Sequence, residues 1–114
     1  MLKLPHKPPI LFAKEILDKT EDLAIVLVEF PKPPTLGMMM EAAAQSSAAL
    51  SNSEKEGYLL SCSNLIMHKK PTGVKFSVHI KSIMSSPSLN ELYFEMKKQE
   101  SIVSSGTLLV MLQN

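Results

Sequence analysis

The sequence predicts an α+β protein in which an antiparallel sheet of about six strands wraps around one central helix. Residues 37–50 are rich in Ala and Met and contain neither proline nor a β-branched residue, which favours a helix that is apolar nearly all round. Apolar segments precede this helix, and alternating apolar and polar residues follow it almost to the end of the chain. A chain of 114 residues is expected to form one domain, residues 1–114.

Two strands are expected before the helix. Three prolines make the first nine residues extended or turn-like, and the mixed apolar stretch 10–19 follows as the first strand. Residues 23–30 (LAIVLVEF) are β-branched-rich and apolar on both faces apart from Glu29, which predicts a strand covered on both sides. Three more prolines end that strand, and Thr35 is the expected N-cap of the helix.

Four strands are expected after the helix. A polar loop at 51–57 ends the helix, and residues 58–67 form the next strand. Residues 74–83 and 92–98 alternate between apolar and polar, and 105–112 is the closing strand. Short turns join the last three strands, which predicts an antiparallel meander. Only this sheet is available to cover the helix, and a sheet wrapped around one helix is the hotdog architecture.

Composition and charge exclude several function classes. The formal net charge of +1 argues against general nucleic-acid binding. The single cysteine, Cys62, excludes an internal disulfide and a Cys-based metal site, and a reducing cytoplasm is the expected location. No apolar run approaches the roughly 20 residues that span a bilayer, and the N-terminus has no signal-peptide pattern. We expect no metal and no cofactor, because the sequence has no ligand cluster and no Gly-rich phosphate loop.

Four stretches of the chain resemble segments of one known family. They are LPHKPPILF (4–12), EAAAQSSAA (41–49), GYLLSCSNLIMHKKPTG (57–73) and SSGTLLVML (104–112). They are similar to the N-terminal Leu-Pro-His segment, the start of the central helix, the following strand and the closing strand of the hotdog-fold β-hydroxyacyl-acyl-carrier-protein dehydratases. The resemblance is closest to the short members of that family that are associated with aryl polyene pathways.

The resemblance implies dehydration of 3-hydroxyacyl thioesters, linked to acyl carrier protein or coenzyme A, in fatty-acid-like biosynthesis. This reaction needs an acid–base group, and Glu41 is the candidate because it is a lone carboxylate in an otherwise apolar helix. Backbone N–H groups at the helix start, around Gly37, suit the enolate-like oxygen. Gln45 lies one turn beyond Glu41 on the same face and can orient its carboxylate.

One family residue is missing from this sequence. A catalytic histidine commonly precedes a Phe-Pro pair in these dehydratases, but here Glu29 precedes the pair that begins at Phe30. His6, in the Leu-Pro-His motif, is the first candidate to replace it. His79 falls on the polar face of a strand, where a solvated role is expected, and His68 lies in a basic turn.

Further residues are candidates for substrate and partner contacts. Phe30 and Met38 are expected to contact the substrate, because apolar side chains of this kind can line an acyl pocket. The basic cluster His68, Lys69 and Lys70 is the expected contact for an acidic acyl carrier protein. A homodimer that pairs two sheets edge to edge is expected, since a small core often gains from a partner subunit.

Two alternative functions stay open. The first is a hotdog acyl thioesterase, in which a helix carboxylate activates water against the thioester carbonyl. The second is a non-catalytic acyl-binding subunit that has lost its histidine. The missing histidine argues against the dehydratase hypothesis. The family-like helix and following strand argue against the thioesterase hypothesis. The retained pair Glu41 and Gln45 argues against the non-catalytic subunit.

Overall fold

A computed structural model of the chain describes residues 11–50 and 56–113. These residues contain six strands, one α-helix and one 3₁₀ turn. Their bounds are β1 Ala13–Lys19, β2 Leu23–Glu29, α1 Leu36–Ser46, η1 Ser47–Leu50, β3 Glu56–Met67, β4 Lys75–Ser85, β5 Leu89–Lys98 and β6 Ser101–Gln113. The expected order of two strands, one helix and four strands is confirmed.

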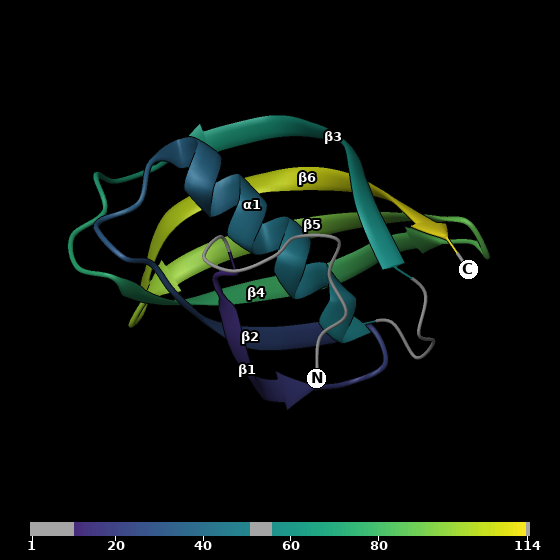
Figure 1. Ribbon diagram of the computed structural model, residues 1–114, viewed down its shortest axis with the longest axis horizontal. Coiled ribbons are helices and arrows are strands. Elements are labelled where there is room, and N and C mark those ends of the chain that lie inside the picture. Colours follow the sequence, from purple (N-terminus) through teal and green to yellow (C-terminus); the bar gives the residue numbers. More distant parts are fainter. Residues whose placement is uncertain (1–10, 51–55, 114) are drawn as a thin grey trace.

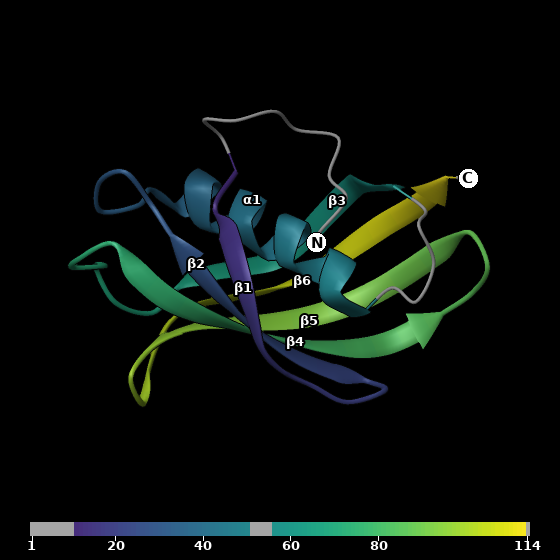
Figure 2. The ribbon, with the colours of Figure 1, turned by 60° about the horizontal axis from the view of Figure 1, so that its bottom comes forward.

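The strands form one antiparallel sheet in the order β1-β2-β4-β5-β6-β3. The predicted meander is confirmed as β4-β5-β6, while β3 lies beyond β6 at the far edge. The sheet is strongly curved, and α1 lies across its concave face (Figures 1 and 2). The predicted sheet of six strands around one helix is therefore confirmed, with β1 and β3 as its two edges.

Thr35 caps the start of α1, as predicted. Its backbone is extended (φ −79°, ψ 167°), and its Oγ1 accepts a hydrogen bond from the Met38 N–H at 3.2 Å. The first intrahelical bond follows directly, from the Met39 N–H to the Thr35 carbonyl oxygen at 3.0 Å. An N-cap of this kind contributes about 1 kcal/mol to helix stability.

The α-helix ends earlier than the sequence predicts. Residues 47–50 continue it as a 3₁₀ turn instead of an α-helix. The hydroxyl of Ser46 donates to the Ala42 carbonyl at 2.7 Å, and that of Ser47 donates to the Ala44 carbonyl at 2.6 Å. Serine hydroxyls that compete for helix carbonyls in this way loosen and bend a helix, which explains the change of winding.

The core lies between α1 and the concave face of the sheet. From α1, it takes Met39, Ala42 and Ala43, all fully buried. The sheet contributes alternate residues of its strands, which are Ala24, Val26, Val28, Phe76, Val78, Ile80, Leu92, Phe94, Met96, Leu108 and Val110. Full burial of each large apolar side chain contributes about 1.5–3 kcal/mol, so this layer is the main stabilising element of the described fold.

Coverage of β2 differs from the expectation. Its concave-face residues are fully buried, but Ile25 and Leu27 on the opposite face are only half-buried. The expectation of a strand covered on both sides is therefore wrong for the described chain, because α1 covers one face only. The apolar sequence of β2 predicts the strand correctly but overestimates how far its second face is buried.

Candidate functional site

Glu41 lies in the second turn of α1, five positions after the first helical residue, Leu36. Its side chain is half-buried, and the Oε1 atom is shielded from solvent. The first turn of α1 contains no acidic residue. The favourable effect of a helix dipole on a carboxylate falls off within the first turn, so the dipole gives little reason for a carboxylate at this position.

The start of α1 offers backbone donors. The N–H groups of Leu36 and Gly37 precede the first intrahelical bond, so the helix itself does not use them. Gly37 is exposed, and a Cβ added there would meet only Thr35 Oγ1, at 4.0 Å. Among the described residues, the fold around Gly37 thus has room for a side chain.

Gln45 joins the helix to the first strand. It is 1% exposed, and its Oε1 accepts hydrogen bonds from the backbone N–H groups of Phe12 (2.7 Å) and Ala13 (3.2 Å). These bonds fix the orientation of the amide group and satisfy two buried backbone donors. The role of Gln45 toward Glu41 stays a prediction. The link to Phe12 was missed at the sequence level, because nothing local signals a bond across 33 positions.

The two apolar candidates lie in different surroundings. Phe30 is 2% exposed and packs between Phe12 and Phe76, with ring centroids 4.9 and 5.8 Å apart and ring planes inclined at 46° and 63°. Together with Phe12 and Glu29 it also lines a cavity of about 240 Å³ beside the ends of β1 and β2. Met38 is half-buried near the start of α1 and packs against the core. Substrate contact by either side chain stays a prediction.

Both described histidines lie on the convex face of the sheet, opposite α1. Ser104 points toward the helix, because its Oγ donates to Met39 Sδ at 3.5 Å, so the next residue, Ser105, points away from it. His68 Nε2 lies 2.8 Å from Ser105 Oγ on that convex side. His79 alternates with the fully buried core residues Val78 and Ile80, which puts it on the same side, as predicted.

The remaining acid–base candidates are therefore few. Neither His68 nor His79 shares the helix side of the sheet with Glu41. His6, the predicted replacement for the missing histidine, lies outside the described residues. Glu29, at the position where the resembled family has its histidine, alternates with core-facing Val28, so its side chain also leaves the helix side.

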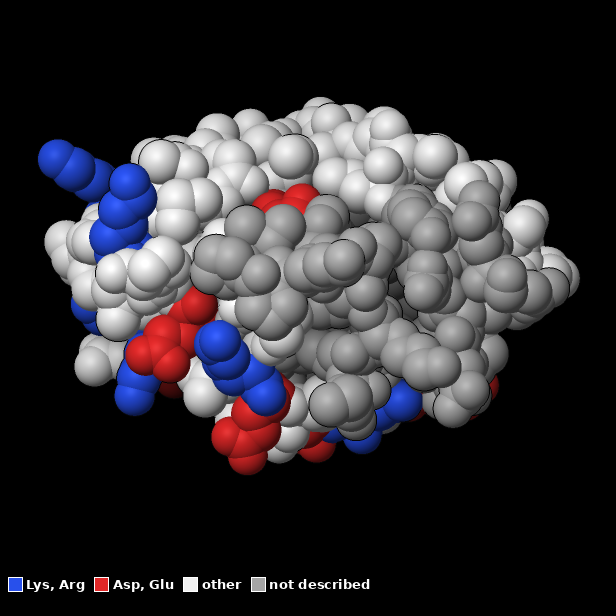
Figure 3. All heavy atoms as spheres, viewed as in Figure 1, with Lys and Arg blue, Asp and Glu red and all other residues white. Residues whose placement is uncertain are grey.

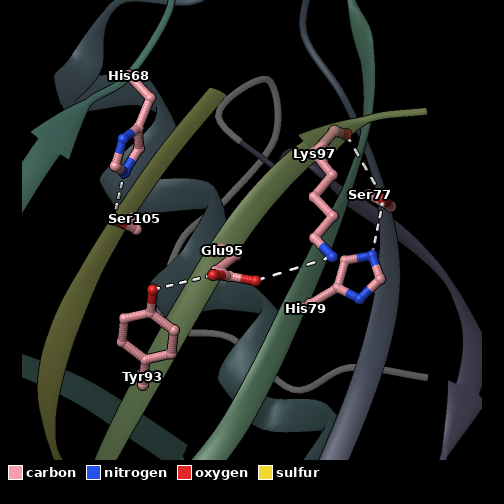
Figure 4. A network of polar contacts seen from close by, with 7 residues as sticks. All are labelled: His68, Ser77, His79, Tyr93, Glu95, Lys97 and Ser105. Carbon is pink, nitrogen blue, oxygen red and sulfur yellow. Dashed lines mark hydrogen bonds and ion pairs between the residues drawn. The ribbon is translucent and has the colours of Figure 1, made fainter. Parts of the chain in front are cut away.

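The convex face carries a network of polar contacts (Figure 4). Tyr93 Oη donates to Glu95 Oε2 at 3.1 Å, and Lys97 Nζ lies 3.8 Å from Glu95 Oε1. Burial raises the pKa of Tyr93, and the bond to Glu95 raises it further, so the phenol stays protonated. Burial lowers the pKa of His79, and the charge of Lys97 lowers it further. Tyr93, Glu95 and Lys97 all lie on β5, and Ser77 Oγ on β4 contacts both His79 Nε2 at 3.2 Å and the Lys97 carbonyl at 3.5 Å.

Other chemistries find no support among the described residues. Burial raises the pKa of the Cys62 thiol, which keeps it protonated and a poor nucleophile. In the described part of the chain, no group of three or more His, Cys, Asp or Glu side chains is placed to hold a metal ion. Within residues 11–50 and 56–113 no helix has the length and apolarity to cross a membrane.

The predicted carrier-binding residues lie at the connection from β3 to β4. Lys69 and Lys70 are exposed and line a cavity together with Lys98 at the end of β5. His68, also exposed, contacts Ser105 on the convex face instead. The sequence did not single out Lys98, because the pair Lys97 and Lys98 is typical of a solvated strand end.

Comparison with known proteins gives structural similarity only. No protein-family model matches the sequence, and no curated protein matches it. Among solved structures, the chain is similar to the dehydratase heterocomplex ApeI:P from Xenorhabdus doucetiae, with a TM-score of 0.81 and 12% identity over 97% of this chain and 88% of that one. An uncharacterised protein from Pyrococcus horikoshii has a TM-score of 0.73 and 15% identity over 94% of this chain and 88% of that one.

A third similar structure is a hypothetical thioesterase with coenzyme A from Streptococcus pneumoniae. Its TM-score is 0.71, with 12% identity over 88% of this chain and 85% of that one. At such identities the likeness shows the fold alone. Together with the observed sheet and helix, it confirms the hotdog fold that the sequence predicts.

Proposed function

We propose that this hotdog-fold chain acts on acyl thioesters and dehydrates 3-hydroxyacyl groups linked to acyl carrier protein or coenzyme A. The observation that carries the proposal is Glu41, a half-buried carboxylate on an apolar helix, one turn beyond Gly37, whose N–H the helix does not use. The sequence resemblance to dehydratases supports it, and so does the likeness to a dehydratase heterocomplex. The same resemblance favours the short aryl-polyene type, and the single cysteine favours a reducing cytoplasm.

Each proposed site residue has a defined step. Glu41 removes a proton from the carbon next to the thioester carbonyl, while the Gly37 N–H stabilises the negative charge on the carbonyl oxygen. The β-carbon–oxygen bond then breaks, and the hydroxyl leaves as water with a proton that His6 is the candidate to supply. The product is a 2-enoyl thioester. Met38 and Phe30 contact the acyl chain, and Gln45 holds the helix face that carries Glu41.

Hydrolysis of the thioester is the second candidate function. It is favoured by the position of His68 and His79 on the convex face, since neither can assist Glu41 from there. A single carboxylate can activate water against a thioester carbonyl, and a hypothetical thioesterase with coenzyme A has a similar fold. The two reactions give different products from the same substrate, so one assay can separate them.

The test is an activity screen with 3-hydroxyacyl thioesters of several chain lengths, on coenzyme A and on acyl carrier protein. We expect loss of water, detected as a 2-enoyl thioester, with the thioester bond intact. Release of free thiol without an enoyl product would mean that the protein hydrolyses the thioester and does not dehydrate the acyl group. Neither product on any substrate would leave the non-catalytic acyl-binding subunit as the remaining function.

Assembly through the β3 edge is part of the proposal. The exposed edge strand β1 carries four charged side chains in seven residues (AKEILDK), which discourages pairing with another strand. The edge strand β3 is longer, has no charged residue from Leu59 to Met67, and exposes Leu60, Ile66 and Met67. We therefore propose a homodimer, or a complex with a similar chain, in which β3 pairs with β3 of the partner.

Leu60→Lys is expected to shift this dimer to monomer at micromolar concentration. Leu60 is 50% exposed, so the new charge costs the monomer little, but in the dimer it would lie at the paired edge. The control is Leu17→Lys on β1, where leucine is 52% exposed and the dimer should persist. Sedimentation velocity measures both. A wild-type chain that is entirely monomeric, or equal effects of both variants, would contradict pairing through β3.

Replacement of Lys69 and Lys70 by Glu is expected to weaken binding of an acidic acyl carrier protein. Complementary charge speeds the encounter of such partners, and salt screens it, so the loss should be largest at low ionic strength. Titration of the carrier at two salt concentrations measures the effect. Unchanged affinity at low salt would mean that the carrier does not dock on this surface.

A further inference from the structure

A cavity of about 230 Å³ lies between the β3–β4 connection and the tight turn from β5 to β6. None of the lining residues is acidic, and three of them are lysines. The residues that line the cavity are Lys69, Lys70, Thr72, Lys98, Gln99, Ser101 and Val103. Figure 3 shows Lys side chains at the left end of the molecule, the end at which β3 connects to β4 in Figure 1.

Two of the three lysine amines are held in place by neutral oxygens. Lys98 Nζ donates to the carbonyl oxygen of Thr72 at 2.6 Å and to its Oγ1 at 3.3 Å. Lys69 Nζ donates to Ser101 Oγ at 2.9 Å. These partners position the amines without neutralising them, and an amine with three N–H donors keeps capacity for a ligand. The cavity is therefore an ordered group of positive charges.

The backbone beside the cavity has a positive φ at Gly73 and hydrogen bonds to β6 that hold the β3–β4 connection. Gly73 has φ +82°, and a Cβ added to it would lie 2.7 Å from Lys98 Nζ. Only glycine accepts this φ easily and also leaves room for the amine. The N–H groups of His68 and Lys69 both donate to the Val103 carbonyl, at 2.7 and 3.2 Å, and so anchor the connection to β6. Hydrogen bonds thus position the amines of Lys69 and Lys98 in the structure.

We propose that this cavity binds the phosphate group of a phosphate ester. Three lysines and no acidic residue line the cavity, and this balance of charge favours an anionic ligand. A phosphate monoester carries about −1.5 to −2 charges and three acceptor oxygens, which suits the lysine amines and the hydroxyls of Thr72 and Ser101. The cavity is smaller than the roughly 300–1,000 Å³ of pockets that enclose whole ligands, so it takes the phosphate and leaves the rest of the molecule outside.

This inference deepens the proposed function and rests on it for the identity of the ester. Lys75, which follows the β3–β4 connection, pairs with Glu29 at the end of β2, and a short connection leads from there to the start of α1. The cavity and the N-terminus of α1 are therefore at the same end of the fold. A coenzyme A thioester carries a phosphate monoester on its ribose, and a carrier-bound pantetheine carries a phosphodiester with one negative charge, so either could place a phosphate group in this cavity.

The experiment titrates the protein with adenosine 3′,5′-bisphosphate, with 4′-phosphopantetheine and with unphosphorylated pantetheine as the control ligand. Amide NMR shifts report the binding site and the affinity without any turnover. We expect at least one phosphorylated ligand to shift the amides of Gly73, Lys98 and Ser101, and pantetheine to leave them unmoved. Binding of the nucleotide points to coenzyme A, and binding of phosphopantetheine alone points to a carrier protein.

Lys98→Gln is expected to weaken binding of the phosphorylated ligand about 10- to 100-fold, the effect of losing one hydrogen bond to a charged group. Lys69→Gln is the second variant, with the same expectation. Lys81→Gln is the control, because Lys81 is exposed on β4 and does not line the cavity. Equal weakening by Lys81→Gln, or no phosphate binding by the wild type, overturns the inference.

Failure of the inference is separable from failure of the proposed function. Turnover of acyl thioesters without phosphate binding at Gly73 and Lys98 overturns the cavity assignment and leaves the function in place. Phosphate binding there, by a chain that neither dehydrates nor hydrolyses thioesters, leaves the cavity assignment in place and overturns the function.

Discussion

Glu41→Gln is expected to lower turnover of the best thioester substrate by about 10²–10⁴-fold, the range typical of losing an acid–base group. Glutamine keeps the shape of the side chain and its hydrogen-bonding capacity but cannot take up the substrate proton. Stability should change little, or rise, because a partly buried charge is removed. Steady-state kinetics and thermal unfolding on the same preparation measure both quantities.

The matched control is Glu15→Gln, the same chemical change at an exposed position of β1. Its kcat/KM should equal that of the wild type. The opposite pattern, with Glu41→Gln active but slightly less stable, would make Glu41 a structural helix residue. Wild-type turnover by Glu41→Gln on every substrate that the protein accepts would end its catalytic assignment.

Gln45→Leu is expected to have the largest effect on stability among the site residues. Leucine has a similar size but no acceptor, so the N–H groups of Phe12 and Ala13 lose their partner inside the protein. A buried donor left unsatisfied costs about 1–3 kcal/mol, and here two share one acceptor. Urea unfolding should give a lower free energy of unfolding by an amount in this range or above it.

Hydrogen exchange distinguishes this mechanism from a general loss of packing. In Gln45→Leu the amides of Phe12 and Ala13 should lose protection to a greater degree than the amide of Val78, in the central strand β4. A variant as stable as the wild type, or one with a uniform loss of protection, would mean that the Gln45 amide does not hold β1 to α1.

Local signals explain what the sequence predicts well. Thr35, the run of Ala and Met after it, and the absence of β-branched residues specify the start of α1 without help from the rest of the fold. The alternation at Phe76, Val78 and Ile80 specifies both the strand β4 and the face that it buries. In each case the preference of neighbouring residues and the final packing agree.

Long-range contacts explain what the sequence does not predict. The bond from the Phe12 N–H to Gln45 joins residues far apart in the chain, and the cavity at Lys98 joins two separate turns. No periodic pattern encodes either contact. Glu41 was recognisable as a candidate because its apolar surroundings are local, whereas the position of His68 on the convex face depends on the pairing of β3 with β6.

The place of β3 in the sheet also constrains how the chain folds. β3 is synthesised before β4 and β5 but pairs with β6. The partner of Cys62 is Leu108, which is synthesised 46 residues later. At about 5–20 residues per second, ribosomal synthesis of that interval takes about 2–9 s. During this time β3, with its uncharged edge, has no partner within its own sheet. The hairpins β4-β5 and β5-β6 close locally, whereas β3 with β6 and β2 with β4 pair across long stretches of the chain. We therefore expect these two non-local pairings to limit the folding rate.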